Sequence, residues 1–153
     1  MSEPLASDAR VAQIWASGRS AGEISDDGLL FFEGETIFSF GRHFPIARHQ
    51  GGAVLVTTES YPVPTTAHIA LVRDAVADCR IFTVPDVEAR TVEEHKANFR
   101  DYGRRISRRQ TLSRQTSGVP NDVESRALVE EANAYAGHFG LSVEPYAWDP
   151  APA

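Results

Sequence analysis

Residues 29–40 read LLFFEGETIFSF, and this segment determines the architecture that we expect for the N-terminal half of the chain. Two aromatic and β-branched runs flank Gly34, which is the signature of a β-hairpin. Further strands are predicted at 44–48 and 53–58. Pro45 cannot donate a backbone hydrogen bond, so it favours an edge or the start of a strand. The four segments predict an antiparallel meander, with a fifth strand at 80–84.

Helical periodicity is predicted on both sides of this sheet region. The expected helices are one between Ser7 and Gly18, one at 67–78 behind Thr65 or Thr66, one from Thr91 to about Gln110, and one from Asn121 to Gly140. Residues 20–28 read as a loop, and the prolines at 62 and 64 keep 59–64 extended.

The fold class that follows is α+β. We expect a single domain in which an antiparallel four- to five-stranded sheet is packed by helices, with a C-terminal helical hairpin. The predicted regions are an N-terminal helix and loop at 1–28, the sheet with one helix at 29–84, the hairpin at 91–140 and an extended tail at 141–153.

The composition is that of a soluble globular domain. The chain has 153 residues, 42% of them apolar, and no run approaches the roughly 18–20 apolar residues of a membrane span. Residues 1–4, MSEP, have neither the basic start nor the apolar core of a signal peptide. Cys79 is the only cysteine, which excludes an internal disulfide and a multi-cysteine zinc site. We therefore expect a cytoplasmic protein without a membrane partner.

The charge of the chain is unevenly distributed. The net charge is -6, but residues 100–114 carry six of the 15 basic residues and one acid, giving +5, and the remainder carries -11. Five arginines of the predicted third helix form a cationic ridge opposite its apolar face; they are Arg100, Arg104, Arg105, Arg108 and Arg109. Such a ridge is a candidate surface for nucleic acid or for an acidic protein, or a solvated face that pairs with acids of the same chain. The negative net charge weakens the nucleic-acid alternative.

A second candidate site lies between the predicted strand at 36–40 and the helix that follows residue 66. Polar and ionisable residues that could form a ligand or anion site gather there; they are Arg42, His43, Ser60, Tyr61, Thr65, Thr66 and His68. A helix N-terminus beside them would offer free backbone N–H groups to an anion. His43 with His68 is a candidate acid–base pair, and Ser60 with a histidine is a candidate nucleophile and base. The structural alternative is a threonine helix cap beside packed aromatic and histidine side chains.

Other chemistry has no support in the sequence motifs. The five histidines show no metal-ligand spacing. The chain has no P-loop, GxGxxG, GxSxG or kinase motif. We therefore assign no catalytic residue, no metal and no cofactor from the sequence.

The central segment reads FSFGRHFPIA at 38–47 and continues with Tyr61 and with TTAH at 65–68. These residues resemble a pattern found in a group of small uncharacterised proteins from phages and plasmids. The pattern of that group is aromatic-Ser-Tyr-Gly-x-His-aromatic-Pro, then Tyr-Ser, then Thr-Thr-x-x-His. This chain departs from it at Phe40, at the two prolines and at His68, which follows Thr66 by two residues. The resemblance implies a mobile-element origin and no particular activity.

Together these observations predict a non-enzymatic binding protein of a phage or mobile element in the bacterial cytoplasm. It would act by protein–protein contact, through the arginine ridge or the acidic remainder, for example by inhibiting host defence machinery. The expected partner is a host or phage protein, such as a nucleic-acid-binding complex, and a homo-oligomer is a further alternative. The other two hypotheses are nucleic-acid binding through Arg100–Arg109 and a small hydrolase or ligand site around His43, Ser60 and His68.

Overall fold

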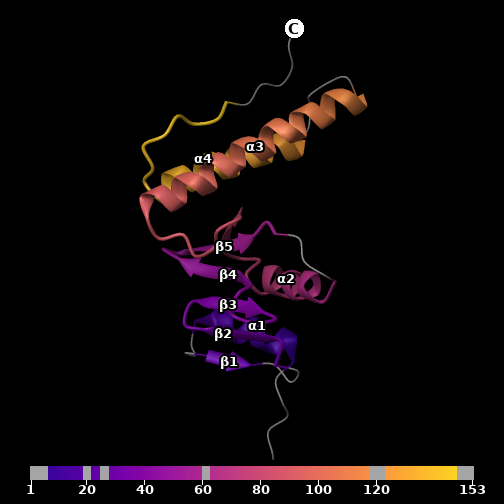
Figure 1. The fold of residues 1–153 in the computed structure, drawn as a ribbon, viewed down its shortest axis with the longest axis vertical. Helices are drawn as coiled ribbons and strands as arrows, with labels where there is room; N and C mark the ends of the chain where they lie inside the picture. Colours follow the sequence, from indigo (N-terminus) through magenta and orange to yellow (C-terminus); the bar gives the residue numbers. More distant parts are fainter. Residues whose placement is uncertain (1–6, 19–21, 25–27, 60–62, 118–122, 148–153) are drawn as a thin grey trace, which may run out of the picture. The chain divides into compact units, whose positions relative to one another are not determined.

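A computed structural model describes residues 7–18, 22–24, 28–59, 63–117 and 123–147. The chain forms two units, Met1–Glu88 and Ala89–Ala153. The first holds a β-sheet with helices α1 (Asp8–Ser17) and α2 (Val63–Ala75), and the second holds helices α3 (Val92–Ser117) and α4 (Val123–His138) (Figure 1). The predicted α+β class and the C-terminal helical hairpin are confirmed.

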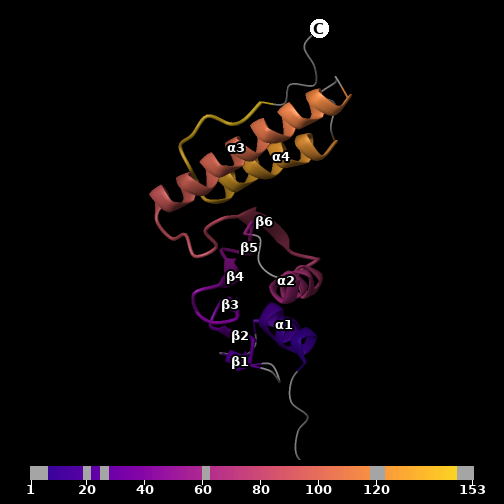
Figure 2. The same cartoon turned by 45° about the vertical axis from the view of Figure 1, so that its right-hand side comes forward.

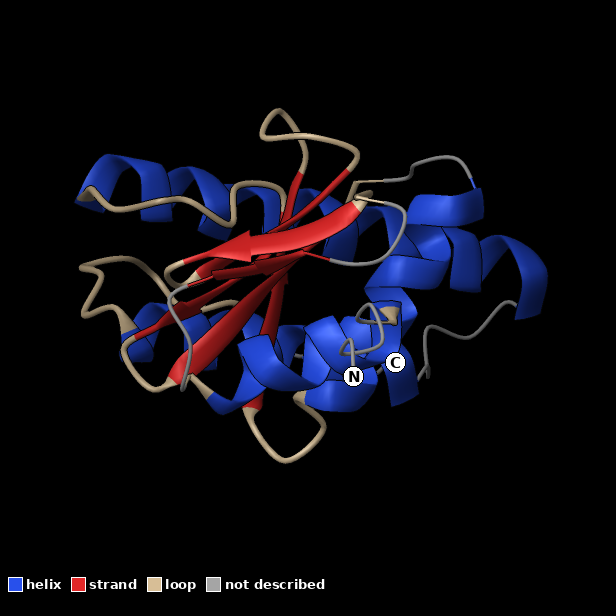
Figure 3. Ribbon diagram, turned by 90° about the horizontal axis from the view of Figure 1, so that it is seen from below, coloured by secondary structure: helices blue, strands red, loops and turns tan. Residues whose placement is uncertain are grey.

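The sheet has six strands in the order β1-β2-β3-β4-β5-β6, and its twist is visible in Figure 3. The strands are β1 Gly22–Ile24, β2 Leu30–Glu33, β3 Thr36–Ser39, β4 Pro45–Gln50, β5 Ala53–Thr57 and β6 Arg80–Val84. Strands β1 to β5 pair antiparallel, and β6 pairs parallel with β5. The sheet is therefore mixed, unlike the antiparallel sheet of four to five strands that we expected, because the connection from β5 to β6 runs through α2 and returns the chain in the same direction.

One strand falls where the sequence predicts a loop. The loop expected over 20–28 is wrong at Gly22–Ile24, which pair with Phe31, Phe32 and Glu33 of β2. Three residues with a single apolar side chain carry no alternating pattern that sequence analysis can detect. Backbone pairing with the edge of the hairpin forms this strand.

Helix α2 begins earlier than predicted. It starts at Val63 and has Pro64 in its first turn, where the missing N–H would have no partner within the helix. Thr65 and Thr66 therefore lie inside the helix, and the prediction that one of them is its N-cap is wrong. Helix α1, in contrast, begins and ends as predicted, with Ser7 as its N-cap and Gly18 at φ 68° as its C-cap.

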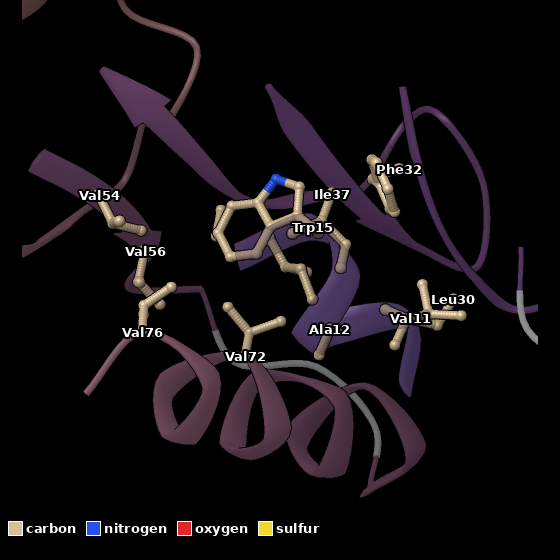
Figure 4. Packing of buried hydrophobic residues seen from close by; sticks show 12 residues of the cluster. Val11, Ala12, Trp15, Leu30, Phe32, Ile37, Val54, Val56, Val72 and Val76 are labelled. Carbon is tan, nitrogen blue, oxygen red and sulfur yellow. The ribbon is translucent and has the colours of Figure 1, made fainter. Parts of the chain in front are cut away.

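Helices α1 and α2 cover the same face of the sheet (Figure 2). Their apolar residues meet those of the strands in one buried cluster, which Figure 4 shows around Trp15. The cluster contains Val11, Ala12 and Trp15 of α1, Val72 and Val76 of α2, and Leu30, Phe32, Ile37, Ile46, Ala47, Val54 and Val56 of the strands. Burial of these side chains is the main stabilising contribution in this unit.

The helices α3 and α4 pack as an antiparallel pair. The predicted stripe of α3 is buried at His95, Phe99, Tyr102 and Ile106, whereas Val92 at its start is 57% exposed. Helix α3 continues to Ser117, beyond the predicted end near residue 110, because no glycine or proline interrupts residues 104–117.

The tail that follows α4 is attached to the hairpin through Tyr146. Its backbone N–H and carbonyl each bond the Asn133 side chain at 2.8 Å, and its hydroxyl donates to the Phe99 carbonyl at 2.7 Å. Its ring also stacks on Phe99, with 4.5 Å between the ring centroids.

Candidate functional site

The five sequence-predicted arginines of α3 occupy two different environments. Arg100, Arg104 and Arg108 are exposed and recur every fourth residue. At a rise of about 1.5 Å per residue, this spacing makes a row roughly 12 Å long on one side of the helix. Arg105 and Arg109 are half-buried. The exposed cationic ridge is therefore a row of three guanidinium groups.

Acidic residues of the same unit hold the two half-buried arginines. The Arg105 Nε donates to Asp101 Oδ2 at 2.7 Å, and its guanidinium lies 4.3 Å from the centroid of the Tyr102 ring. Arg109 forms an ion pair with Glu124 of α4. Pairing with acids of the same chain thus accounts for these two arginines. Arg104 also approaches Asp101, at 3.4 Å, but 68% of its side chain remains exposed.

A groove beside the ridge combines arginine with leucine. It has a volume of about 240 Å³ and is lined by Arg105, Arg108, Arg109, Leu112 and Leu128. Leu112 is 53% exposed, so the groove presents an apolar surface as well as three cations. Leu112 follows Arg108 by one helical turn, which the sequence spacing shows, but Leu128 joins the groove only through the packing of α4 on α3. The sequence analysis places neither leucine in a candidate site.

The second predicted site contains a buried polar network. The Ser39 Oγ lies 3.0 Å from Thr65 Oγ1 and 2.7 Å from His68 Nδ1. The other ring nitrogen of His68, Nε2, lies 3.2 Å from Asp8 Oδ2. Ser39 has no exposed surface, and Thr65 and His68 are each 4% exposed. We call these four residues the polar latch, because they join β3, α2 and α1.

The polar latch has the residue types of a hydrolytic Ser-His-Asp site but not its accessibility. A nucleophilic serine must reach the carbonyl of a substrate. The hydroxyl of Ser39 is fully buried and is shared between Thr65 and His68. In this conformation these groups hold the fold together and cannot attack a substrate. The sequence predicted Thr65 and His68 in this region but not Ser39 or Asp8.

The other residues of the second predicted site are not part of the polar latch. Arg42 is exposed and forms an ion pair with Glu33 at the end of β2. The hydrogen bonds from Arg42 lower the pKa of the Glu33 carboxyl. His43 and Thr66 are exposed, whereas both ring nitrogens of His68 are taken by Ser39 and Asp8. The acid–base pair of His43 and His68 is not formed by these contacts, and Ser60 and Tyr61 lie outside the described residues.

The loop between β3 and β4 is tightly constrained. Phe40 has φ 62°, and no other non-glycine residue in the described part of the chain has a positive φ. This conformation costs about 1–2 kcal/mol. Its backbone N–H donates to the Leu29 carbonyl at 2.8 Å, and its ring centroid lies 5.9 Å from that of His68. Phe40 thus connects this loop to Leu29 through its backbone and to His68 through its ring.

Comparison with known proteins adds no relative: no protein-family model, no curated protein and no solved structure matches this chain. Within the described ranges, no helix combines the length and the apolar character needed to cross a bilayer. The same residues contain no group of three or more His, Cys, Asp or Glu side chains that are placed to share a metal ion. The functional argument therefore rests on the groove and the ridge of the hairpin.

Proposed function

We propose that the chain is a binding protein that docks an acidic segment of a partner protein in the groove between α3 and α4. The observation that carries the proposal is the groove itself, in which Arg108 lies beside the exposed side chain of Leu112. A partner that places a carboxylate next to an apolar side chain is complementary to this pair. Guanidinium groups bind carboxylates through two parallel hydrogen bonds, which gives such docking its orientation.

The surroundings of the groove favour a protein over a nucleic acid. Glu124 lies at the groove through its ion pair with Arg109, and Asp101 is bonded to Arg105. Two of the three arginines that line the groove are thus paired with acids of the same chain, so the closely spaced phosphates of a nucleic acid would meet few unpaired cations there. An interface that combines arginine with apolar side chains is typical of protein–protein contacts. The mobile-element origin and a target in host defence stay predictions from the sequence.

The proposal can be tested with two synthetic probes, a 16-residue helical peptide rich in Glu and Leu and a 16-base-pair DNA duplex. We expect the peptide to bind, and the variants Arg108→Ala and Leu112→Ser each to weaken its binding roughly tenfold or more, as loss of a charged hydrogen bond or of an apolar contact implies. Arg126→Ala is the matched control, because Arg126 is exposed on α4, pairs with Glu130 and does not line the groove.

Each outcome of the titration decides between the hypotheses. If the duplex binds more tightly than the peptide, and Arg108→Ala weakens the duplex while Leu112→Ser does not, the ridge is a nucleic-acid site and the proposal is wrong. If neither variant changes peptide binding relative to Arg126→Ala, the groove is not the docking site.

A further inference from the structure

A pocket opens in the first unit at the C-terminal end of α1, away from the polar latch. Its volume is about 390 Å³, which falls in the range of small-molecule sites. It is lined by Ala16, Ser17 and Gly18 at the helix end, Gly34 and Glu35 of the turn between β2 and β3, and His49 of β4.

The walls of this pocket are held together by Trp15. Its indole N–H donates to the Glu35 carbonyl at 2.9 Å, and its ring lies against that of His49, with 4.3 Å between the centroids. Its own carbonyl accepts the N–H of Gly18 at 3.1 Å and lies 3.0 Å from His49 Nε2. Trp15 is 1% exposed, so the helix end, the turn and the strand are fixed to one buried side chain. The pocket is therefore preorganised.

The hydrogen bond to the Trp15 carbonyl fixes the tautomer of His49. A carbonyl oxygen can only accept, so Nε2 of His49 must carry the proton in this bond. This bond occupies Nε2, and His49 forms part of the pocket wall together with Glu35.

Two features of the lining attract positive charge to this pocket. The C-terminal end of a helix carries a partial negative charge, and the last turn of α1 contains no basic residue to offset it. The Glu35 carboxylate is 65% exposed; it forms an ion pair with Arg48, whose Nη2 lies 3.7 Å from it, a distance too long for a hydrogen bond. The carboxylate therefore keeps its capacity to accept hydrogen bonds from a ligand.

We infer that this pocket binds an organic cation with N–H donors, an alkylammonium or guanidinium group whose apolar stem lies against the pocket wall. The negative helix end and the Glu35 carboxylate are complementary to such a group, because both attract a cation. The site lies in a different unit from the α3–α4 groove, so its binding is independent of the proposed function.

The experiment uses the full chain and titrates it with n-butylammonium, agmatine, the peptide Gly-Arg-Gly and neutral n-butanol, followed by amide NMR spectra. We expect the cations to shift the amide signals of Ser17, Gly18, Gly34 and Glu35, and n-butanol at equal concentration to leave them in place. Binding of the free amines alone identifies a small-molecule site. Binding of Gly-Arg-Gly as well identifies a site for a cationic side chain of a partner.

A pair of variants in one turn provides the control. Glu35→Gln keeps the size of the side chain and removes its charge, and we expect at least tenfold weaker binding of agmatine. Glu33→Gln removes the charge of a carboxylate two residues away that is paired with Arg42 and does not line the pocket, and we expect binding within twofold of the parent. Equal loss in both variants, shifts by n-butanol that match those of the cations, or no shift at 10 mM cation would overturn the inference.

Discussion

Replacement of Ser39 by alanine tests the polar latch directly. The substitution removes a hydroxyl with no exposed surface that bonds His68 Nδ1 at 2.7 Å and Thr65 Oγ1 at 3.0 Å. A buried polar group that loses its partner costs about 1–3 kcal/mol. Because Thr65 lies in a helix, its hydroxyl can turn to a backbone carbonyl, whereas the ring nitrogen of His68 has no such freedom. We therefore expect Ser39→Ala to lower the free energy of unfolding of this unit by about 2–3 kcal/mol.

The assay is urea unfolding followed by the fluorescence of Trp15, in a Trp148→Phe background so that a single indole reports. Ser17→Ala is the control, because its hydroxyl bonds the Ile14 carbonyl at an exposed helix end, and it should change the free energy by less than about 0.5 kcal/mol. A double-mutant cycle with His68→Ala should then show coupling of about 1 kcal/mol or more. A loss from Ser39→Ala no larger than that of the control, or additive losses in the cycle, would refute the role of the polar latch.

Three further results are expected in the hairpin. Gly103→Ala improves helix propensity, yet its Cβ would lie 2.6 Å from the Tyr146 hydroxyl, so hydrogen exchange of the tail after α4 should accelerate. The pKa of Glu94 is lowered, chiefly because the Thr91 backbone N–H donates to its carboxylate. Its contribution to the free energy of unfolding is present above the pKa of the unfolded state and is lost as the pH falls through the lower pKa of the folded state. Glu94→Gln should therefore reduce the loss of stability at acid pH. Burial raises the pKa of Tyr102 far above the usual range, so this tyrosine should not ionise between pH 9 and 11. The phenolate absorbance gained over that range should therefore be the same in Tyr102→Phe as in the parent. A smaller amplitude in the variant would contradict this.

The sequence predicted those elements whose signals are local. Ser7, the apolar spacing of α1 and Gly18 lie within one short segment, and the hairpin at 29–40 carries its own turn, so both were predicted correctly. The start of α2 was predicted too late. Pro64 disfavours helical backbone at the residue before it, Val63, but a proline also fits within the first turn of a helix. The two rules conflict, and only the packing of α2 on the sheet decides between them.

The candidate sites were less predictable, because they depend on contacts between residues far apart in the sequence. Asp8 and His68 are 60 positions apart in the sequence. No sequence pattern indicates that an acidic residue in the first turn of one helix contacts a histidine of another helix. Ser39 did carry a signal, since it is a polar residue in a strand whose four residues are all buried. A buried hydroxyl needs a partner, but Arg42 and His43 are nearer in the sequence than Thr65 and His68, so the sequence does not show which residue it is.

The polar latch accounts for three polar residues of the segment 38–68. Ser39, Thr65 and His68 are buried together, and the Ser39 hydroxyl lies within hydrogen-bond distance of the other two. Side chains that are buried in this way attach helix α2 to strand β3. The polar latch contributes no residue to the groove beside Arg108 or to the pocket beside Glu35, and the binding specificity of the chain is to be sought at those two places.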